Sequence, residues 1–194
     1  MEEIIRYFYE VFIPKIVDVR LNFYKDKEHC LGDLAIATKD ETDALGRKIL
    51  ECFVTEMNSL IKELPERKRS WYVERKGDIK TLTTTLGDIV FEKTLYTSKK
   101  EVDSEGKALS CYLLDKFLNL NENQSMTEDT LAKIYEEAVE TSYRKAGNGC
   151  SPDSVTKQTV KNVLHKTQFP KNFQIPEIKK EVEYLYIDAD EDHY

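Results

Sequence analysis

The sequence has no long apolar run and few glycines or prolines. No segment approaches the ~18 consecutive apolar residues that a membrane-spanning helix needs, so we expect no membrane association. Seven Gly and five Pro among 194 residues exclude collagen-like and Gly/Pro-rich disordered chains. Glu2 and Glu3 stand where a secretory signal peptide carries positive charge. We therefore expect a cytoplasmic protein.

Cysteine and histidine are also scarce. A structural zinc site needs ligands clustered in pairs, and the chain has no C-x-x-C pair. None of the three histidines stands near a cysteine in the setting of a catalytic nucleophile. We expect free thiols in a reducing compartment at Cys30, Cys52, Cys111 and Cys150.

The net charge of −7 is a sum of opposed blocks. Taken whole, it argues against a simple basic nucleic-acid binder. However, residues 65–100 carry a net +4 and residues 141–180 a net +6, against −7 for 101–140 and −6 for 181–194. A surface attracts ligands through charges within a Debye length of about 8–10 Å, so the local blocks matter more than the sum.

The first third of the chain is predicted to be helical. Apolar residues at three- and four-residue spacing predict a helix over 2–25, which Pro14 should kink or delay. The same spacing predicts a second helix over 40–64, capped by Asp40 and stopped by Pro65. We expect the two helices to pack together, and a dimerising coiled coil is the alternative.

A small β unit should follow. Residues 71–96 are rich in β-favouring side chains and have a turn signal at Gly87, so they predict an antiparallel hairpin. The polar stretch 97–107 predicts a loop, and the apolar stretch 108–120 a short helix.

Residues 126–166 are predicted to form a helix, a short helix, a turn and a final helix. Thr156 is a good N-cap for a helix over 157–166, whose core face would hold Val160, Val163 and Leu164. Such an order is typical of a helix-turn-helix, in which the last helix enters the DNA major groove.

The polar face of that last helix has the side-chain types that contact phosphates and bases. They are Lys157, Gln158, Lys161 and Asn162, while Arg144 and Lys145 on the preceding helix would contact the DNA backbone. A helical hairpin with a merely solvated polar face is the alternative.

The C-terminus is a predicted buried strand that ends in carboxylates. It is marked by the apolar and aromatic residues Val182, Tyr184, Leu185, Tyr186 and Ile187, and Asp188 and Asp190 follow them. Oxygen ligands suit Mg²⁺, and two-metal phosphoryl-transfer sites use such carboxylates as metal ligands. An acidic solvated tail is the alternative.

Four segments in this order resemble one known family: TLTTTLGDIVFEKTLY, TSYRKAG, SVTKQTVKNVLHK and LYIDADEDH. They are similar to the N-terminal part of bacterial insertion-sequence transposases of the ISLre-two type. The resemblance implies a DNA-binding region followed by a ribonuclease-H-like domain, whose DDE carboxylate triad uses Mg²⁺ or Mn²⁺. It implies that Asp190, or else Asp188, is the first catalytic acid and metal ligand.

Together these observations predict a mainly helical α+β protein. We expect N-terminal helices with a β-hairpin unit over 1–107, a helix-turn-helix-like DNA-binding region over 108–168, and a linker with the isolated first strand of a catalytic domain over 169–194. A ribonuclease-H-like domain needs on the order of 100 further residues.

We therefore expect a truncated transposase that binds DNA at terminal inverted repeats and does not catalyse strand transfer alone. Mg²⁺ is expected only for the full-length family. The alternative is a non-catalytic helical interaction or regulatory protein, and a homodimer or a full-length transposase is the expected protein partner.

Overall fold

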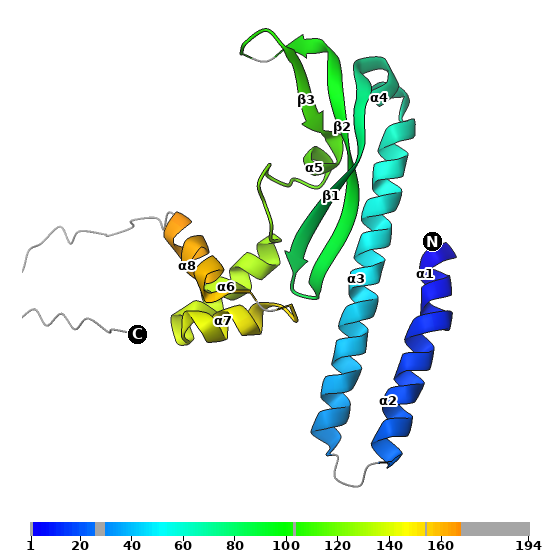
Figure 1. Ribbon diagram of the computed structural model, residues 1–194, viewed down its shortest axis with the longest axis vertical. Coiled ribbons are helices and arrows are strands. Elements are labelled where there is room, and N and C mark those ends of the chain that lie inside the picture. The colour runs from blue at the N-terminus through cyan, green and yellow to red at the C-terminus, as the bar shows by residue number, and fades with distance from the viewer. Residues whose placement is uncertain (1, 26–29, 103, 154, 168–194) are drawn as a thin grey trace, which may run out of the picture.

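The computed structural model describes residues 2–25, 30–102, 104–153 and 155–167. It is a mixed α+β structure, as the sequence predicts, and its helices flank a three-stranded antiparallel sheet (Figure 1). None of the described helices is long and apolar enough to cross a membrane. The elements are α1 (Glu2–Tyr7), the π-helix η1 (Phe8–Phe12), α2 (Ile13–Lys25), α3 (Leu31–Glu63), α4 (Pro65–Ser70), β1 (Trp71–Thr84), β2 (Gly87–Val102), β3 (Ala108–Tyr112), α5 (Leu113–Phe117), α6 (Glu128–Glu140), α7 (Tyr143–Cys150) and α8 (Lys157–Lys166).

The predicted N-terminal helix runs from α1 through η1 to α2. Pro14 has no N–H to donate to the carbonyl four residues earlier, and the π-helical turn η1 lies directly before it. This continuous helix packs against α3, as expected. Two ion pairs join them: Lys48 Nζ lies 2.7 Å from Glu3, and Lys15 Nζ 3.1 Å from Glu41.

Helix α3 begins earlier than the sequence predicts. Its N-cap is Cys30, whose backbone N–H donates to the Asp33 carboxylate over 2.8 Å. The expectation that Asp40 caps this helix was therefore wrong, because Asp40 lies inside it. The helix ends at Glu63, and Pro65 opens the short helix α4.

The predicted hairpin is confirmed. Strands β1 and β2 pair from Thr84↔Gly87 to Trp71↔Ser98. Gly87 has φ +114°, a conformation that favours glycine.

The expected loop over 97–107 and helix over 108–120 were largely wrong. Strand β2 continues to Val102, and β3 pairs with it at Leu95↔Tyr112 and Thr97↔Ser110. From Leu95 onward, β2 has backbone N–H and C=O groups that need hydrogen-bond partners. Pairing with these groups outweighs the apolar pattern that predicts a helix at residues 108–112.

Helix α3 and the sheet enclose the first hydrophobic cluster. Among the described residues, no strand pairs with the second edge of β2 before Leu95, and side chains of α3 supply partners there. The Val90 N–H donates to Glu51 over 3.0 Å, and Asn58 donates to the Glu92 carbonyl over 3.0 Å. The buried members of the cluster are Val54, Ile61, Leu82, Ile89, Phe91, Tyr96 and Leu114.

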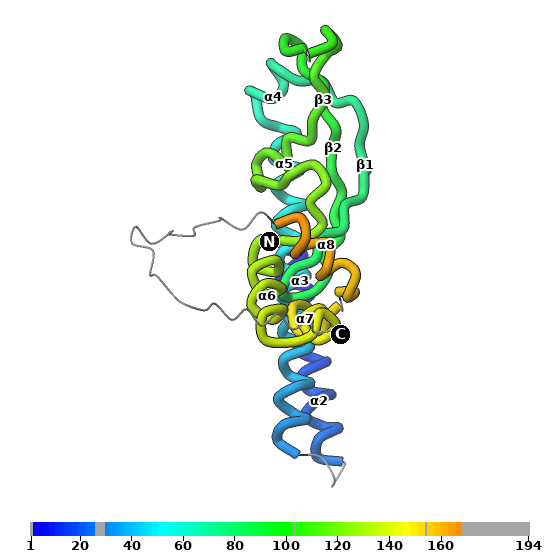
Figure 2. Tube along the Cα trace, turned by 90° about the vertical axis from the view of Figure 1, so that its left-hand side faces the viewer, coloured from blue at the N-terminus to red at the C-terminus, as the bar shows by residue number. Residues whose placement is uncertain are grey.

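Helices α6, α7 and α8 enclose a second cluster, with the order predicted for residues 126–166. They lie together beside the hairpin turn (Figures 1 and 2). In the sequence, the last residue of the first cluster is Leu120 and the first residue of the second cluster is Met126. The division of the chain into separate domains stays a prediction. The strand expected at 182–187 lies outside the described residues. The buried members are Met126, Ile134, Ala146, Cys150, Val155 and Val160.

Candidate nucleic-acid interface

Helix α8 has one apolar face and one polar face. Its N-cap is Thr156, as predicted, whose hydroxyl accepts the Thr159 N–H over 3.2 Å. Val160 is fully buried, and Val163 and Leu164 pack against the second cluster. The four α8 residues among the six predicted to contact DNA are all exposed: Lys157, Gln158, Lys161 and Asn162.

Two amide side chains on this polar face hold each other. Gln158 Nε2 donates to Asn162 Oδ1 over 3.0 Å, one helical turn away. The bond limits the rotamers of both side chains, so less entropy is lost when they meet a partner. Amide side chains of this kind form paired hydrogen bonds with adenine edges in a major groove.

Helix α7 places basic side chains beside the start of α8. Arg144 and Lys145 are exposed, whereas Ala146, Gly147 and Cys150 on the other side are buried. Burial raises the pKa of the Cys150 thiol, which keeps it neutral. Both helices therefore expose their cations and turn their apolar sides to the second cluster.

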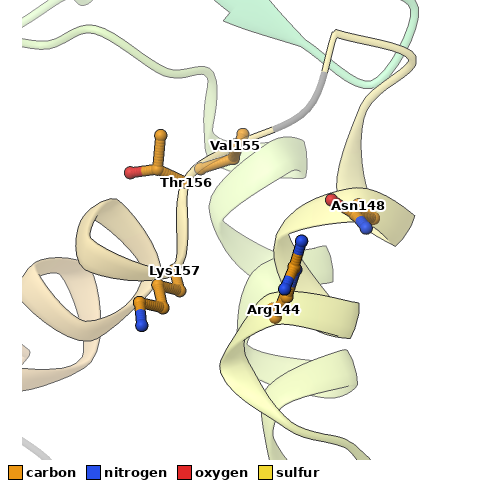
Figure 3. Close-up of a pocket in the computed structure, with 5 residues that line it drawn as sticks. All are labelled: Arg144, Asn148, Val155, Thr156 and Lys157. Atoms are coloured by element: carbon orange, nitrogen blue, oxygen red, sulfur yellow. The ribbon is translucent and has the colours of Figure 1, made fainter.

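A hollow of about 300 Å³ lies between α7 and the start of α8, lined by Arg144, Asn148, Val155, Thr156 and Lys157. Arg144 extends into this hollow, and Lys157 points away from it on the α8 side (Figure 3). The first backbone N–H groups of α8 add partial positive charge nearby. The Arg144 guanidinium and these N–H groups are donors of the kind that bind a phosphate oxygen.

Charge is divided between the helices of this cluster. Helix α6 has five acidic residues and one lysine, whereas residues 143–166 have five basic residues and one acidic residue, Asp153. A polyanion is thus attracted to the α7–α8 side and repelled from the α6 side.

The single acid among those basic residues joins the cluster to the sheet. The Asp153 carboxylate accepts the Asp88 N–H over 2.7 Å and lies 3.2 Å from the Arg47 guanidinium. A second link runs from the Thr85 hydroxyl to Asp129 over 2.7 Å. These bonds hold the three helices against the hairpin turn.

Backbone pairing strengthens the same junction. Thr83 donates its N–H to the Ser125 carbonyl over 2.9 Å and accepts the Thr127 N–H over 3.0 Å. Sequence reasoning missed these contacts and the role of Asp153. Residues 151–153, Ser-Pro-Asp, are typical of a turn, but their sequence gives no partner for Asp153.

A close backbone approach sets the packing of α7 against the segment that leads into α8. The Gly147 carbonyl accepts the Val155 N–H over 3.1 Å. A Cβ atom on Gly147 would lie 2.0 Å from the Val155 carbonyl oxygen. Only glycine fits this position without a backbone shift, which the sequence alone did not reveal.

The expected catalytic and metal-binding residues, Asp188 and Asp190, lie outside the described residues. Within the described ranges, no group of three or more His, Cys, Asp or Glu residues could hold a metal ion. Both assignments stay predictions.

The model of an uncharacterised protein family, UPF0236, matches residues 25–194. The chain belongs to the UPF0236 family. Similar relatives occur in Caldanaerobacter subterraneus subsp. tengcongensis. One UPF0236 protein is 39% identical over 94% of this chain and 40% of its own length, and another is 37% identical over 89% of this chain and 38% of its own length.

The chain thus spans about two fifths of the length of these relatives. Their names state membership of the family and no activity. No solved structure matches the chain.

Proposed function

We propose that this UPF0236 chain is the DNA-binding part of an insertion-sequence transposase of the ISLre-two type. The observation that carries the proposal is the outer face of α8, where Lys157, Gln158, Lys161 and Asn162 are exposed together. The resemblance of four ordered segments to that type of transposase supplies the biological setting.

Helix α8 acts as the recognition helix in this proposal. Its N-terminal half enters the major groove, where Gln158 and Asn162 read base edges. Lys157 and Lys161 neutralise phosphates on either side of the groove. The terminal inverted repeats of the parent element are the proposed target.

Helix α7 anchors the cluster on the DNA backbone. Arg144 and Lys145 contact phosphates of one strand, and the hollow beside Arg144 receives a phosphate oxygen. The acidic helix α6 then faces away from the DNA. Such an orientation follows from the divided charge of the cluster.

Strand transfer is proposed for the whole relatives rather than for this chain. Asp190 or Asp188 would supply oxygen ligands of the type that Mg²⁺ prefers. A bound ion would lower the pKa of water and stabilise the charge of phosphoryl transfer. Residues 2–167 hold and orient the DNA, and no catalytic step is assigned to them.

Fluorescence anisotropy with labelled duplexes tests the proposal. The chain should bind a duplex of the terminal inverted repeat more tightly than a scrambled duplex. Asn162→Ala should reduce that preference about 10-fold or more by removing a base contact. Lys161→Ala should weaken binding to both duplexes and reduce the salt slope by about 1.

Glu136→Ala on the exposed side of α6 is the matched control, and it should leave binding unchanged or slightly tighter. An absence of DNA affinity at low salt refutes the proposal. So does an equal loss of affinity in the α6 and α8 variants.

A non-catalytic interaction or regulatory role is the second candidate. It is favoured by large exposed aromatic residues on η1 and α2, namely Tyr9 and Tyr24, both 68% exposed. A chain of this kind would compete with a full-length transposase for the same DNA sites. Inhibition of transposition by the intact chain, lost in Lys161→Ala, would distinguish this role from a complete absence of function.

A further inference from the structure

The first 25 residues expose a continuous apolar stripe. Six large side chains recur every three or four residues along α1, η1 and α2. The exposed fraction of each of these residues lies between 39% and 68%. We call this set the N-terminal stripe: Ile5, Tyr9, Ile13, Val17, Leu21 and Tyr24.

The stripe is separate from the face that packs on α3. The half-buried side chains of the same helix are Phe8, Phe12, Ile16 and Phe23, among others. One packing partner buries the apolar face of an ordinary amphipathic helix, whereas this helix has a second apolar face. The described part of the chain covers only the first of them.

The four members of the stripe on α2 lie on an arm of the molecule. Helix α2 and the first half of α3 run side by side and extend beyond the sheet and the three-helix cluster (Figures 1 and 2). A long flat partner could therefore lie along the arm without meeting the rest of the fold. A helix from a second arm has this shape.

The sequence of the stripe is self-complementary in an antiparallel pairing. If Ile13 lies opposite Val17 of a second copy, Tyr9 lies opposite Leu21, and Ile5 lies next to Tyr24. The same two-fold register repeats every contact in both directions, as a symmetric dimer requires.

Charge supports the same register. Apart from Glu3 and Lys15, which pair with α3, the half of the helix before residue 13 has two acids and one base, and the half from 13 to 25 has two bases and one acid. An antiparallel pair places the acidic half of each copy on the basic half of the other. In particular, Glu10 lies opposite Arg20, and both are exposed.

The exposed apolar area is of the right size. At their exposed fractions, the six side chains present on the order of 700 Å². A standard protein–protein interface buries about 800 Å² per partner. Leu31 and Ile36 at the start of α3, 75% and 63% exposed, extend the apolar surface of the arm.

We propose that the N-terminal stripe pairs two copies of this chain, helix 2–25 against helix 2–25 in antiparallel orientation. With the two α3 helices outside, the two arms form a four-helix bundle. This inference is independent of the proposed DNA-binding role, since it uses none of the α7 or α8 residues.

Sedimentation velocity of the intact chain over a range of concentrations tests the pairing. We expect a species of about 45 kDa, twice the 22.6 kDa chain, which dissociates on dilution. Val17→Glu places two buried charges at the centre of the dimer and should raise the dissociation constant at least about 100-fold. Asn22→Glu is the control, since it adds the same charge at an exposed polar position of α2 and should change nothing.

Charge reversal tests the orientation and leaves all six stripe residues in place, although Arg20 also lies over the Tyr24 ring, 5.5 Å from its centroid. Glu10→Arg and Arg20→Glu should each weaken the dimer, and the chain carrying both should recover it. A strict monomer at every concentration overturns the proposal. A dimer that Val17→Glu leaves intact, or that the double reversal fails to restore, also overturns it.

Discussion

The close approach at Gly147 gives the sharpest test of how α7 meets α8. Gly147→Ala would place a Cβ atom 2.0 Å from the Val155 carbonyl oxygen and 3.4 Å from Val160 Cγ2. The first neighbour is backbone, so it cannot swing aside as a flexible side chain can. Overpacking of this kind costs about 1–3 kcal/mol, and a backbone clash at such a short distance belongs at the upper end.

A gain in helix propensity opposes that cost. Replacing glycine by alanine inside a helix stabilises it by up to about 1 kcal/mol. The clash is larger, so we expect Gly147→Ala to destabilise the protein by about 2 kcal/mol. For a chain of this length such a loss lowers the Tm by about 4–8 °C.

Gly149 in the same helix is the matched control. A Cβ atom there would meet only the Glu137 carboxyl group, at 3.4 Å or more, which a flexible side chain can accommodate. Gly149→Ala should therefore raise the Tm by about 2–4 °C. Thermal unfolding followed by circular dichroism measures both variants, and a Gly147→Ala protein as stable as Gly149→Ala refutes the packing described for α7.

Three further predictions concern other parts of the fold. Asp115→Ala leaves the Lys93 ammonium, 2.5 Å from that carboxylate, buried without its counter-ion and should cost about 3–5 kcal/mol in urea unfolding, whereas an apolar pair at both positions should cost much less. Asp153→Ala should cost about 1–3 kcal/mol and speed hydrogen exchange at the hairpin turn, and unchanged exchange would contradict the junction. Burial raises the pKa of the Cys150 thiol, so iodoacetamide at pH 8 should modify the exposed Cys30 first. Cys150 should gain reactivity only at higher pH. Mass spectrometry measures the labelling, and equal labelling of the two cysteines would argue against the second cluster.

The sequence predicts a structural feature correctly where one residue type has a single local role in forming it. Thr156 predicted the start of α8 because its hydroxyl satisfies a free helix N–H. Gly87 predicted the hairpin turn because few other residues adopt its positive φ. The polar and apolar faces of α8 followed from helical period alone.

Features that depend on distant partners could not be read from the sequence. Strand β3 forms because the backbone groups of β2 from Leu95 to Val102 lie at an unpaired sheet edge. That edge exists only once the hairpin is folded. Asp153 matters because Arg47 and the Asp88 N–H, far away along the chain, converge on it. Gly147 is constrained by the Val155 backbone, a contact that exists only once the segment before α8 packs against α7.

The two proposals depend on different parts of the molecule, which makes their combination informative. The N-terminal stripe lies on α1 to α2, whereas α8 lies in the second cluster, and Val17→Glu touches no residue of that cluster. If this variant loses the dimer and keeps its DNA affinity, one copy binds DNA by itself. If it also binds an inverted repeat more weakly while its α8 side chains are unchanged, two α8 helices of one dimer contact two half-sites of the same duplex, because a two-fold protein matches a two-fold target.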